Sequence, residues 1–487
     1  MNLKLMRLKS SKPRVHAKRA RHPRAVEAGH SLYNASVRIL ISAGEASGEM
    51  YGAQLIRALR QRLAKPDCGA TGFSPVEHNT PSNLAGEGAR ATPLQLEFFG
   101  VGGEKMHAAG CDLVIDAREL SVVGITEILS HLPKIWGLFH KLIAEVDKRR
   151  PELAIVIDSP AFNWRVAREM KKRGIPVVYY VCPQFWAWRQ GRVRFLRKYV
   201  DKALVIFPFE KKFYSDRGVD TEFVGHPLAE LPRPAISREQ YAAEHGLDHG
   251  KQWITLMPGS RRKEVRMNLP EMLSSASVLG QGYEFLLPVA PTLDQKFVED
   301  LIGARIGAGV HTRPIAQPSI GEPAREWTPE PTQLRPARVH LVTEALPALA
   351  HSRTAIVASG TATIEAAMME TPFVMVYRVT PLTYLLGRWT VKVPHFAMVN
   401  LIAGERVVPE LVQQEFTAER VVAELRQIIA DGVPRQRMIE RLHKVKTLLR
   451  IECARGHAAG RAAEAIVNLL QTRSPESMPQ HLTPHVL

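Results

Sequence analysis

Short, mostly apolar runs that alternate with helical patterns constrain the fold of this chain more than any other feature of its sequence. A strand that is apolar at nearly every position is buried on both faces, which is typical of a parallel sheet covered by helices. The runs form two series, at Val37–Ser42, Leu153–Ile157, Pro176–Val181 and Ala203–Phe207, and at Trp253–Met257, Glu284–Pro288, Thr354–Ala358 and Pro372–Tyr377. The sequence therefore predicts an α/β protein with two doubly wound, Rossmann-like domains that face a cleft.

Changes in composition mark the boundaries of these domains. The Pro-rich piece His226–Pro234 is the natural hinge, and two stretches rich in Gly, Pro, Ser and Thr interrupt the strand–helix series. The predicted parts are a basic disordered leader (1–36), a first domain (37–228, with a surface insertion at 66–92), a second domain (229–418, with a surface insertion at 303–338), C-terminal helices that pack on the first domain or on a dimer partner (419–471), and a disordered tail (472–487).

Positive charge is concentrated at the start of the chain. The formal net charge is +17, and the first 30 residues hold nine Lys or Arg and a single acid, Glu27. That segment has no apolar periodicity, so we expect a solvated tail, with contact to anionic lipid or nucleic acid as the alternative. A nucleic-acid module would interleave basic and aromatic residues on a defined fold, so we expect no nucleic-acid partner.

Cysteine usage and hydropathy bear on the compartment. The four cysteines, at 68, 111, 182 and 453, lie far apart and make no metal-ligand spacing. A disulfide framework or zinc site is therefore not expected, and a reducing cytoplasm fits best. No stretch approaches the roughly 18 uninterrupted apolar residues of a membrane span.

Two motifs in the first half follow buried strands. In the first, Ser42–Met50, Gly44 and Gly48 allow a close backbone approach, and the following helix offers free N–H groups to an anion; a simple tight turn would look the same. In the second, Ala154–Asn163, Asp158 stands where a parallel strand ends, which is the edge where ligands bind. A carboxylate there can act as a general base, whereas the alternative is an Asp that caps the next helix.

A third motif, Cys182–Arg192, begins at the carboxyl end of another strand of the first series. Trp186 and Trp188 beside Arg189 can stack on a sugar or base and meet a phosphate, although packing of at least one Trp in the core is the plainer interpretation.

Two loops in the second half have the chemistry of diphosphate sites. In Leu256–Glu264, Gly259 and Ser260 can present backbone N–H groups and Arg261 a planar cation; the missing Lys-Ser/Thr ending argues against a P-loop NTPase.

The other loop, Ala358–Glu365, places Ser359, Gly360 and Thr361 before a helix, with Glu365 one turn further to hold ribose hydroxyls; a capped helix with Glu365 in solvent is the alternative. There is no Asp-x-Asp metal anchor, so Arg261 and helix dipoles would neutralise a leaving diphosphate.

Taken in order, these and several shorter segments resemble the lipid-A-disaccharide synthase family from Arg38 to about Ala463. The matching segments are Ala43–Glu49, Phe99–Gly103, Val123–Glu127, Ile157–Pro160, Trp186–Gln190, Phe223–Pro227, Pro258–Arg261, Ser359–Ala362, Asn400–Gly404 and Pro409–Leu411. The family pattern departs at Ala161, where the family commonly has a second acid, which leaves Asp158 as the only carboxylate of its motif.

The resemblance implies a GT-B glycosyltransferase fold whose last helices cross back to the first domain. It implies an inverting transfer from UDP-2,3-diacylglucosamine to 2,3-diacylglucosamine 1-phosphate (lipid X), giving a β-1′,6-linked disaccharide 1-phosphate and UDP. The implied reaction needs no metal or other cofactor and takes place at the cytoplasmic face of the inner membrane. Some members exchange the C-terminal region in dimers, so a homodimer is among the expected partners.

By the family pattern, Asp158 is the candidate base and Arg261 the candidate donor-phosphate contact. Glu45, Ser47 and Asn400 are carried over as substrate-binding residues, and we add Gly48, Trp188 and Arg189. The apolar segment Val122–Ile143, with nearby Lys and His, is expected to contact acyl chains, or else simply to cover the first sheet. Another GT-B enzyme, such as an undecaprenyl-linked transferase or a UDP-sugar 2-epimerase, would share the nucleotide loops but not Ala43–Glu49 or Trp186–Gln190.

Overall fold

The structure is a computed structural model, and it describes residues 36–64, 95–120, 125–306, 310–313, 337–381, 384–385, 393–450 and 457–473. The predicted leader and tail, the insertion at 66–92 and most of the insertion at 303–338 lie outside these residues.

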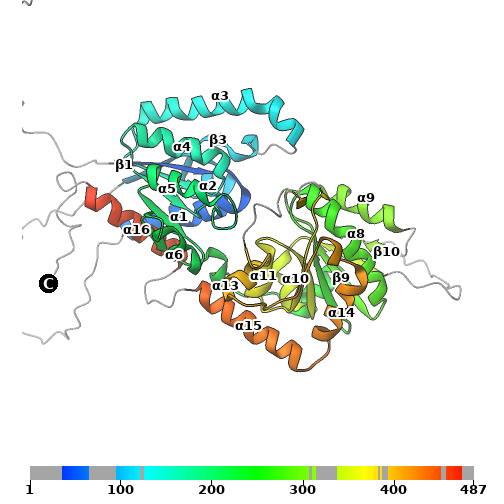
Figure 1. Ribbon diagram of the computed structural model, residues 1–487. Helices are drawn as coiled ribbons and strands as arrows, with labels where there is room; N and C mark the ends of the chain where they lie inside the picture. The colour runs from blue at the N-terminus through cyan, green and yellow to red at the C-terminus, as the bar shows by residue number, and fades with distance from the viewer. Residues whose placement is uncertain are drawn as a thin grey trace, which may run out of the picture.

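Two parallel sheets dominate the described part of the chain (Figure 1). The first has the strand order β3-β2-β1-β4-β5-β6-β7 and the second β10-β11-β9-β8-β12-β13-β14. The strands of the first sheet are β1 (Ser36–Ala43), β2 (Gln95–Gly102), β3 (Cys111–Asp116), β4 (Leu153–Ile157), β5 (Val177–Tyr180), β6 (Lys202–Val205) and β7 (Thr221–Phe223). Those of the second are β8 (Gln252–Met257), β9 (Tyr283–Pro288), β10 (Val310–Arg313), β11 (Ala337–Val342), β12 (Thr354–Ala358), β13 (Phe373–Tyr377) and β14 (Glu410–Val412).

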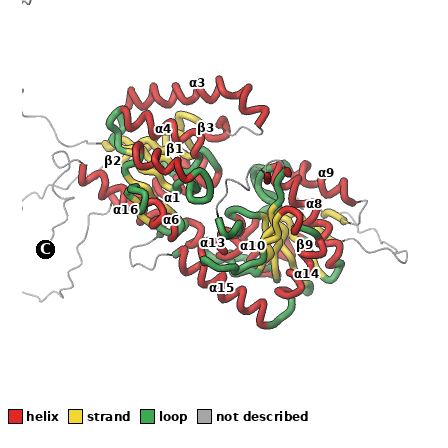
Figure 2. The backbone as a smooth tube through the Cα atoms, in the orientation of Figure 1, coloured by secondary structure: helices red, strands yellow, loops and turns green. Residues whose placement is uncertain are grey.

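Helices lie on the faces of both sheets, as the red and yellow segments of Figure 2 show. Those of the first half are α1 (Ala46–Ala64), α2 (Glu104–Ala108), α3 (Ile125–Arg149), α4 (Pro160–Lys172), α5 (Val193–Tyr199) and α6 (Pro208–Ser215). The second half has α7 (Arg238–His245), α8 (Arg262–Leu279), α9 (Gln295–Ile306), α10 (Ala345–His351), α11 (Ala362–Met368), α13 (Met398–Ala403), α14 (Ala418–Ile429), α15 (Val433–Leu449) and α16 (Ala458–Arg473). Short 3-10 turns are η1 (Ala117–Leu120), η2 (Gln190–Arg192), η3 (Pro227–Glu230) and η4 (Gln413–Glu415).

The central strands are buried along their whole length, which explains their continuous apolar sequences. Every residue of β4 and of β12 is buried. Because both faces of each sheet are covered by helices, every position of a central strand must be apolar or internally bonded. The predicted α/β fold with two doubly wound domains is thereby confirmed.

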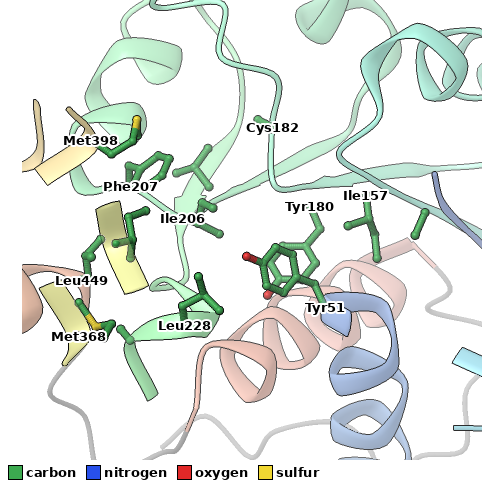
Figure 3. Packing of buried hydrophobic residues seen from close by; sticks show 14 of the residues in the cluster. Tyr51, Ile157, Tyr180, Cys182, Ile206, Phe207, Leu228, Met368, Met398 and Leu449 are labelled. Carbon is green, nitrogen blue, oxygen red and sulfur yellow. The ribbon is translucent and has the colours of Figure 1, made fainter. Parts of the chain in front are cut away.

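The two halves are joined through buried side chains at the hinge. Figure 3 shows Tyr51 and Tyr180 of the first half near Leu228 of η3, with Met368 of α11 and Leu449 of α15 in the same cluster. The backbone N–H of His226 donates to the Leu449 carbonyl at 3.1 Å, which ties the hinge to the C-terminal helices.

The last helix returns to the first half of the chain. Helix α16 packs against α1, with Ala462 and Ile466 fully buried and Arg62 3.2 Å from Glu464. This crossing is the one expected for the C-terminal helices of a GT-B fold, and it places both ends of the described chain on the first domain (Figure 1).

Candidate functional site

The strand order reverses near the middle of each sheet, and the predicted motifs follow the strands at these two points. In the first sheet the reversal lies between β1 and β4, whose carboxyl ends lead into Glu45 and Asp158. In the second it lies between β8 and β12, which lead into the Gly259–Arg261 and Ser359–Thr361 loops. Open α/β sheets bind ligands at such switch points, outside the carboxyl ends of the strands.

A strained turn holds Asp158 at the end of β4. Asp158 and Ser159 have φ angles of 47° and 44°, in the left-handed region that residues with a Cβ seldom adopt. The Asp158 carbonyl accepts hydrogen bonds from the Tyr179 hydroxyl and from Asn163 Nδ2, both at 2.9 Å. Buried Asn163 also donates to the Ile157 carbonyl at 2.8 Å and accepts from Ser42 Oγ at 2.6 Å. Strain maintained by surrounding bonds is typical of functional residues.

The Asp158 side chain does not act as the cap of the next helix, because the N-cap of α4 is Ser159. Burial is the main cause that raises the pKa of Asp158 to about 6, and the nearby Glu45 carboxylate is the second. The Ser159 N–H and the Arg261 guanidinium act in the opposite direction. The carboxyl group therefore titrates close to neutral pH, which suits a group that must take up and release a proton.

The Glu45 loop packs directly against the Asp158 turn. A Cβ on Gly44 would lie 2.8 Å from the Cβ of Ser159, so only glycine allows the two loops to approach this closely. Gly48 is buried over Ile157, and Ser47 is half-buried in the first turn of α1. Glu45 is exposed at the loop surface.

Arg261 connects the two halves of the site. Its Nη2 lies 3.4 Å from Glu45 Oε2 in the first domain, and its Nη1 lies 3.2 Å from Glu264 Oε1 in its own loop. The side chains of Arg261 and Glu45 are 68% and 45% exposed, so their ion pair contributes little stability. Its significance is the proximity of a cation of the second domain to the Glu45–Asp158 pair of the first.

Glu264 shows how the β8–α8 loop is organised, and the sequence analysis missed it. Its Oε2 accepts hydrogen bonds from the backbone N–H groups of Ser260 and Arg261, at 3.2 and 3.3 Å. The N–H group of Ser260, which the sequence predicts to face a ligand, is thus bonded within the chain. Gly259 has a φ of 122°, and a Cβ there would lie 2.7 Å from the Cβ of Glu264. Glu264 is the N3 residue of α8 and forms a capping box with Arg261 as the N-cap. Because Arg261 stands where the usual S/T-x-x-E pattern has Ser or Thr, that pattern could not reveal this acid.

The β12–α11 loop differs from the β8–α8 loop in the use of its backbone N–H groups. Ser359 N–H donates to the Val376 carbonyl at 3.0 Å and Ser359 Oγ to the Phe396 carbonyl at 2.9 Å. Within the described residues, the N–H groups of Gly360 and Thr361 donate no hydrogen bond. Gly360 has a φ of 144°, and a Cβ there would meet nothing within 4 Å. Among the described residues, this loop therefore has two N–H groups without a partner at the second switch point.

Glu365 is half-buried and not a solvent-facing residue. Burial raises its pKa to about 7. Its carboxylate also raises the pKa of Tyr51, on α1 of the first domain, with a smaller contribution from Asp158; burial of the Tyr51 hydroxyl is the main cause. Glu365 and Asp158 therefore both lie near the same tyrosine at the domain junction.

The two tryptophans of the third motif differ in their surroundings. Trp186 is buried, and its Nε1 donates at 2.9 Å to the buried carboxylate of Glu210. Trp188 is 44% exposed, with the Arg189 guanidinium 4.5 Å from its ring centroid. This loop follows β5, next to the Asp158 turn at the same edge of the sheet. Of the three side chains predicted to meet a sugar or phosphate, Trp188 and Arg189 are therefore accessible to a ligand and Trp186 is not.

Asn400 is fully buried, and all its hydrogen-bonding capacity is used within the chain. Its Nδ2 donates to the Val408 carbonyl and to Glu410, and its Oδ1 accepts from the N–H groups of Val407 and Val408. An amide with two donors and two acceptors occupied has none left for a substrate. In this geometry Asn400 supports the site rather than lining it.

The described residues contain no group of three His, Cys, Asp or Glu side chains placed to hold a metal ion. In the same part of the chain, no helix is long and apolar enough to cross a membrane.

Comparisons with known proteins identify the family. The model of the lipid-A-disaccharide synthetase family matches residues 39–307 and 329–465. The chain belongs to this family. Relatives include the lipid-A-disaccharide synthases of Koribacter versatilis, 44% identical over 90% of this chain and 100% of that protein, and of Acidobacterium capsulatum, 42% identical over 90% and 97%. Members of the family are glycosyltransferases, so the expected family and enzyme class are confirmed.

Solved structures agree on the fold. The glycosyltransferase of kitacinnamycin is 15% identical, with a TM-score of 0.52, over 89% of this chain and 99% of its own. The Staphylococcus aureus MnaA–UDP co-structure is 12% identical, with a TM-score of 0.51, over 90% and 97%. At these identities the likeness shows the GT-B fold of the family and does not bear on substrates.

Proposed function

We propose that the chain transfers the diacylglucosamine unit of UDP-2,3-diacylglucosamine to the 6-hydroxyl of lipid X, with inversion at the anomeric carbon. The observation that carries the proposal is the meeting of Asp158, Glu45 and Arg261 where the two switch points face each other. A base from one domain and a phosphate-binding cation from the other are the two parts that a single displacement requires.

Asp158 is proposed as the general base. In an inverting transfer the acceptor hydroxyl attacks the anomeric carbon opposite the diphosphate, and its proton passes to a base within hydrogen-bond reach. A carboxyl with a pKa near 6 is mostly ionised at pH 7 and still basic enough to accept that proton late in the step. Glu45 contributes by keeping that pKa high.

The loops of the second domain are proposed to hold the donor. The Arg261 guanidinium can bind a diphosphate through charge-assisted hydrogen bonds. The diphosphate would then compete for this guanidinium with its two carboxylate neighbours, Glu45 and Glu264. The N–H groups of Gly360 and Thr361 would add donors to the leaving group, and Glu365 would bind the ribose hydroxyls. Negative charge that grows on the departing UDP would thereby be stabilised without a metal ion.

Trp188 and Arg189 are proposed to bind the acceptor, because they lie exposed beside the Asp158 turn. Ser47 and Gly48 would shape the same side of the site, with Gly48 allowing close approach of the chain. For Asn400 we replace the direct substrate contact with a supporting role.

Helix α3 is proposed to contact the cytoplasmic face of the inner membrane. Trp136 on this helix is 56% exposed and is flanked by exposed Lys134, His140 and Lys141, whereas Leu142 is fully buried. An exposed Trp among cations is typical of an interfacial helix. The side chains of residues 121–132 lie outside the described part of the chain. Replacing Trp136 by Ser is expected to weaken binding to anionic vesicles, and unchanged cosedimentation would exclude this contact.

The decisive assay combines UDP-2,3-diacylglucosamine and lipid X in detergent micelles with EDTA, comparing the natural chain with Asp158→Ala. We expect disaccharide from the natural chain and a loss of about a hundredfold or more in the variant, within the range for a general base. Product from both proteins would remove Asp158 from the chemistry. If the natural chain releases no UDP, another GT-B reaction must be considered.

A further inference from the structure

Glu410, in the Pro409–Leu411 motif, has no role in the proposed reaction, yet three donors converge on its side chain. Its carboxylate accepts the backbone N–H of Phe396 at 3.0 Å, the backbone N–H of Ala397 at 2.9 Å and Nδ2 of Asn400 at 2.8 Å. The Glu410 side chain is only 13% exposed. Ala397 is the N-cap of α13, so Glu410 also satisfies the backbone N–H group of the residue at which that helix begins.

The peptide group between Phe396 and Ala397 links Glu410 to the β12–α11 loop. Its N–H points to Glu410, and its carbonyl accepts the Ser359 hydroxyl at 2.9 Å. A negative charge on the N–H side polarises the peptide and makes its carbonyl a stronger acceptor. The Ser359 hydroxyl is thereby committed as a donor to the chain, and its direction is set by a residue about 50 positions further along the sequence.

Asn400 locks the same segment from the other side. Its Oδ1 accepts from the N–H groups of Val407 and Val408, so the turn that leads into β14 is bonded to α13. The Phe396–Asn400 segment is consequently held at both ends, and it cannot shift relative to Ser359 without breaking several bonds to Glu410 at once.

We propose that Glu410 is a positioning residue of the donor site, acting on the nucleotide loop through the Phe396–Ala397 peptide and the Ser359 hydroxyl. The inference rests on the proposed binding of a nucleoside diphosphate at this loop. Glu410 touches no substrate. It fixes the loop so that the free N–H groups of Gly360 and Thr361 face the switch point of the second sheet.

The test is a double-mutant cycle on UDP binding, with the full-length chain and the variants Glu410→Gln, Ser359→Ala and the double substitution. In Glu410→Gln, an NH₂ group replaces one of the two carboxylate oxygens on which three donors converge. This NH₂ group is itself a donor, so it would face another donor and a hydrogen bond would be lost. We expect each single variant to weaken UDP binding roughly 5- to 20-fold, which is typical of one lost hydrogen bond to a charged or polarised group. If Glu410 acts through Ser359, the double variant should have about the same affinity for UDP as the single variant with the lower affinity.

Steady-state kinetics distinguish positioning from a general structural role. We expect Glu410→Gln to raise KM for the UDP-sugar and leave KM for the acceptor unchanged, and Glu410→Asp to recover part of the loss. The matched control is Glu405→Gln, between α13 and β14, where an exposed carboxylate pairs with Arg441 and with no other described residue. Its kinetics should equal those of the natural chain. Should Glu410→Gln fail to fold, the cycle is run with Glu410→Asp.

Two results would overturn the inference. One is a double variant whose UDP affinity falls by the product of the two single effects, because Glu410 would then act independently of Ser359. The other is an equal rise of both KM values in Glu410→Gln. If the natural chain itself binds no UDP, the proposed function fails as well, and that outcome is recognised before any variant is measured.

Discussion

The pH dependence of the reaction follows from the burial of Asp158. With a pKa of about 6, the carboxyl is roughly 90% ionised at pH 7 and roughly 10% ionised at pH 5. A base works only in its ionised form, so kcat/KM should fall about tenfold between these pH values. A carboxyl with the ordinary pKa of 3.8 would lose less than about 10% of its activity over the same range.

The fall of kcat/KM at low pH is the acid limb of the pH profile. Removing a neighbouring charge should move this limb in a predictable direction. Glu45 raises the pKa of Asp158, so Glu45→Gln should shift the limb to lower pH. Burial is the larger cause and persists in the variant, so the limb should remain above that of an ordinary aspartate. An isosteric amide also preserves the size of the side chain, which limits the change to charge.

The assay is initial-rate transfer from pH 4.5 to 8, with both substrates below their KM so that the free enzyme is reported. Glu365, whose pKa is raised to about 7 by burial, also titrates in this range, so the profiles are repeated in a Glu365→Gln background. A natural-chain limb near pH 4, or a Glu45→Gln limb displaced to higher pH, would refute the electrostatic reasoning and Asp158 as the base.

Three further predictions concern stability and the donor loop. The folded-state pKa of Asp158 lies above its unfolded value, so the ionised carboxylate destabilises the folded chain at pH 7. Asp158→Asn should therefore raise the free energy of unfolding at pH 7 by at most about 3 kcal/mol, as measured by chemical denaturation. The gain should shrink as the pH falls through 6 towards 4. The buried Tyr180 hydroxyl has no hydrogen-bond partner within the described residues, so Tyr180→Phe should leave the denaturation midpoint unchanged or higher. Gly259→Ala should weaken UDP binding at least tenfold in calorimetry, because its φ of 122° and the Cβ of Glu264 leave no room for a methyl group.

Sequence patterns were sufficient for the central strands because those strands are buried on both faces. The predicted run Leu153–Ile157 is β4 as the structure has it, and Thr354–Ala358 is β12. Strands nearer the sheet edges escaped notice. In β3 the exposed Asp112 interrupts the apolar run, and the three-residue β7 is too short to show a period.

For the site, sequence reasoning located the loops but not the bonds inside them. Asp158, Glu45 and Arg261 were identified because strand ends and charge are visible in the sequence. Which N–H groups are already occupied is a tertiary property, so the roles of Glu264 and Glu410 were not apparent. Asn400 is the clearest case: a motif position looks functional whether its amide faces a substrate or four groups of its own chain.

The packing of α16 on α1 has a consequence for synthesis on the ribosome. About 235 residues separate the end of β7 at Phe223 from the start of α16 at Ala458. At a translation rate of roughly 5 to 20 residues per second, the first domain waits roughly 12 to 50 seconds for its last helix. During that interval the surface of α1 that α16 will cover remains open to solvent, while the second sheet can already close. The domain that begins first is therefore the one that is finished last.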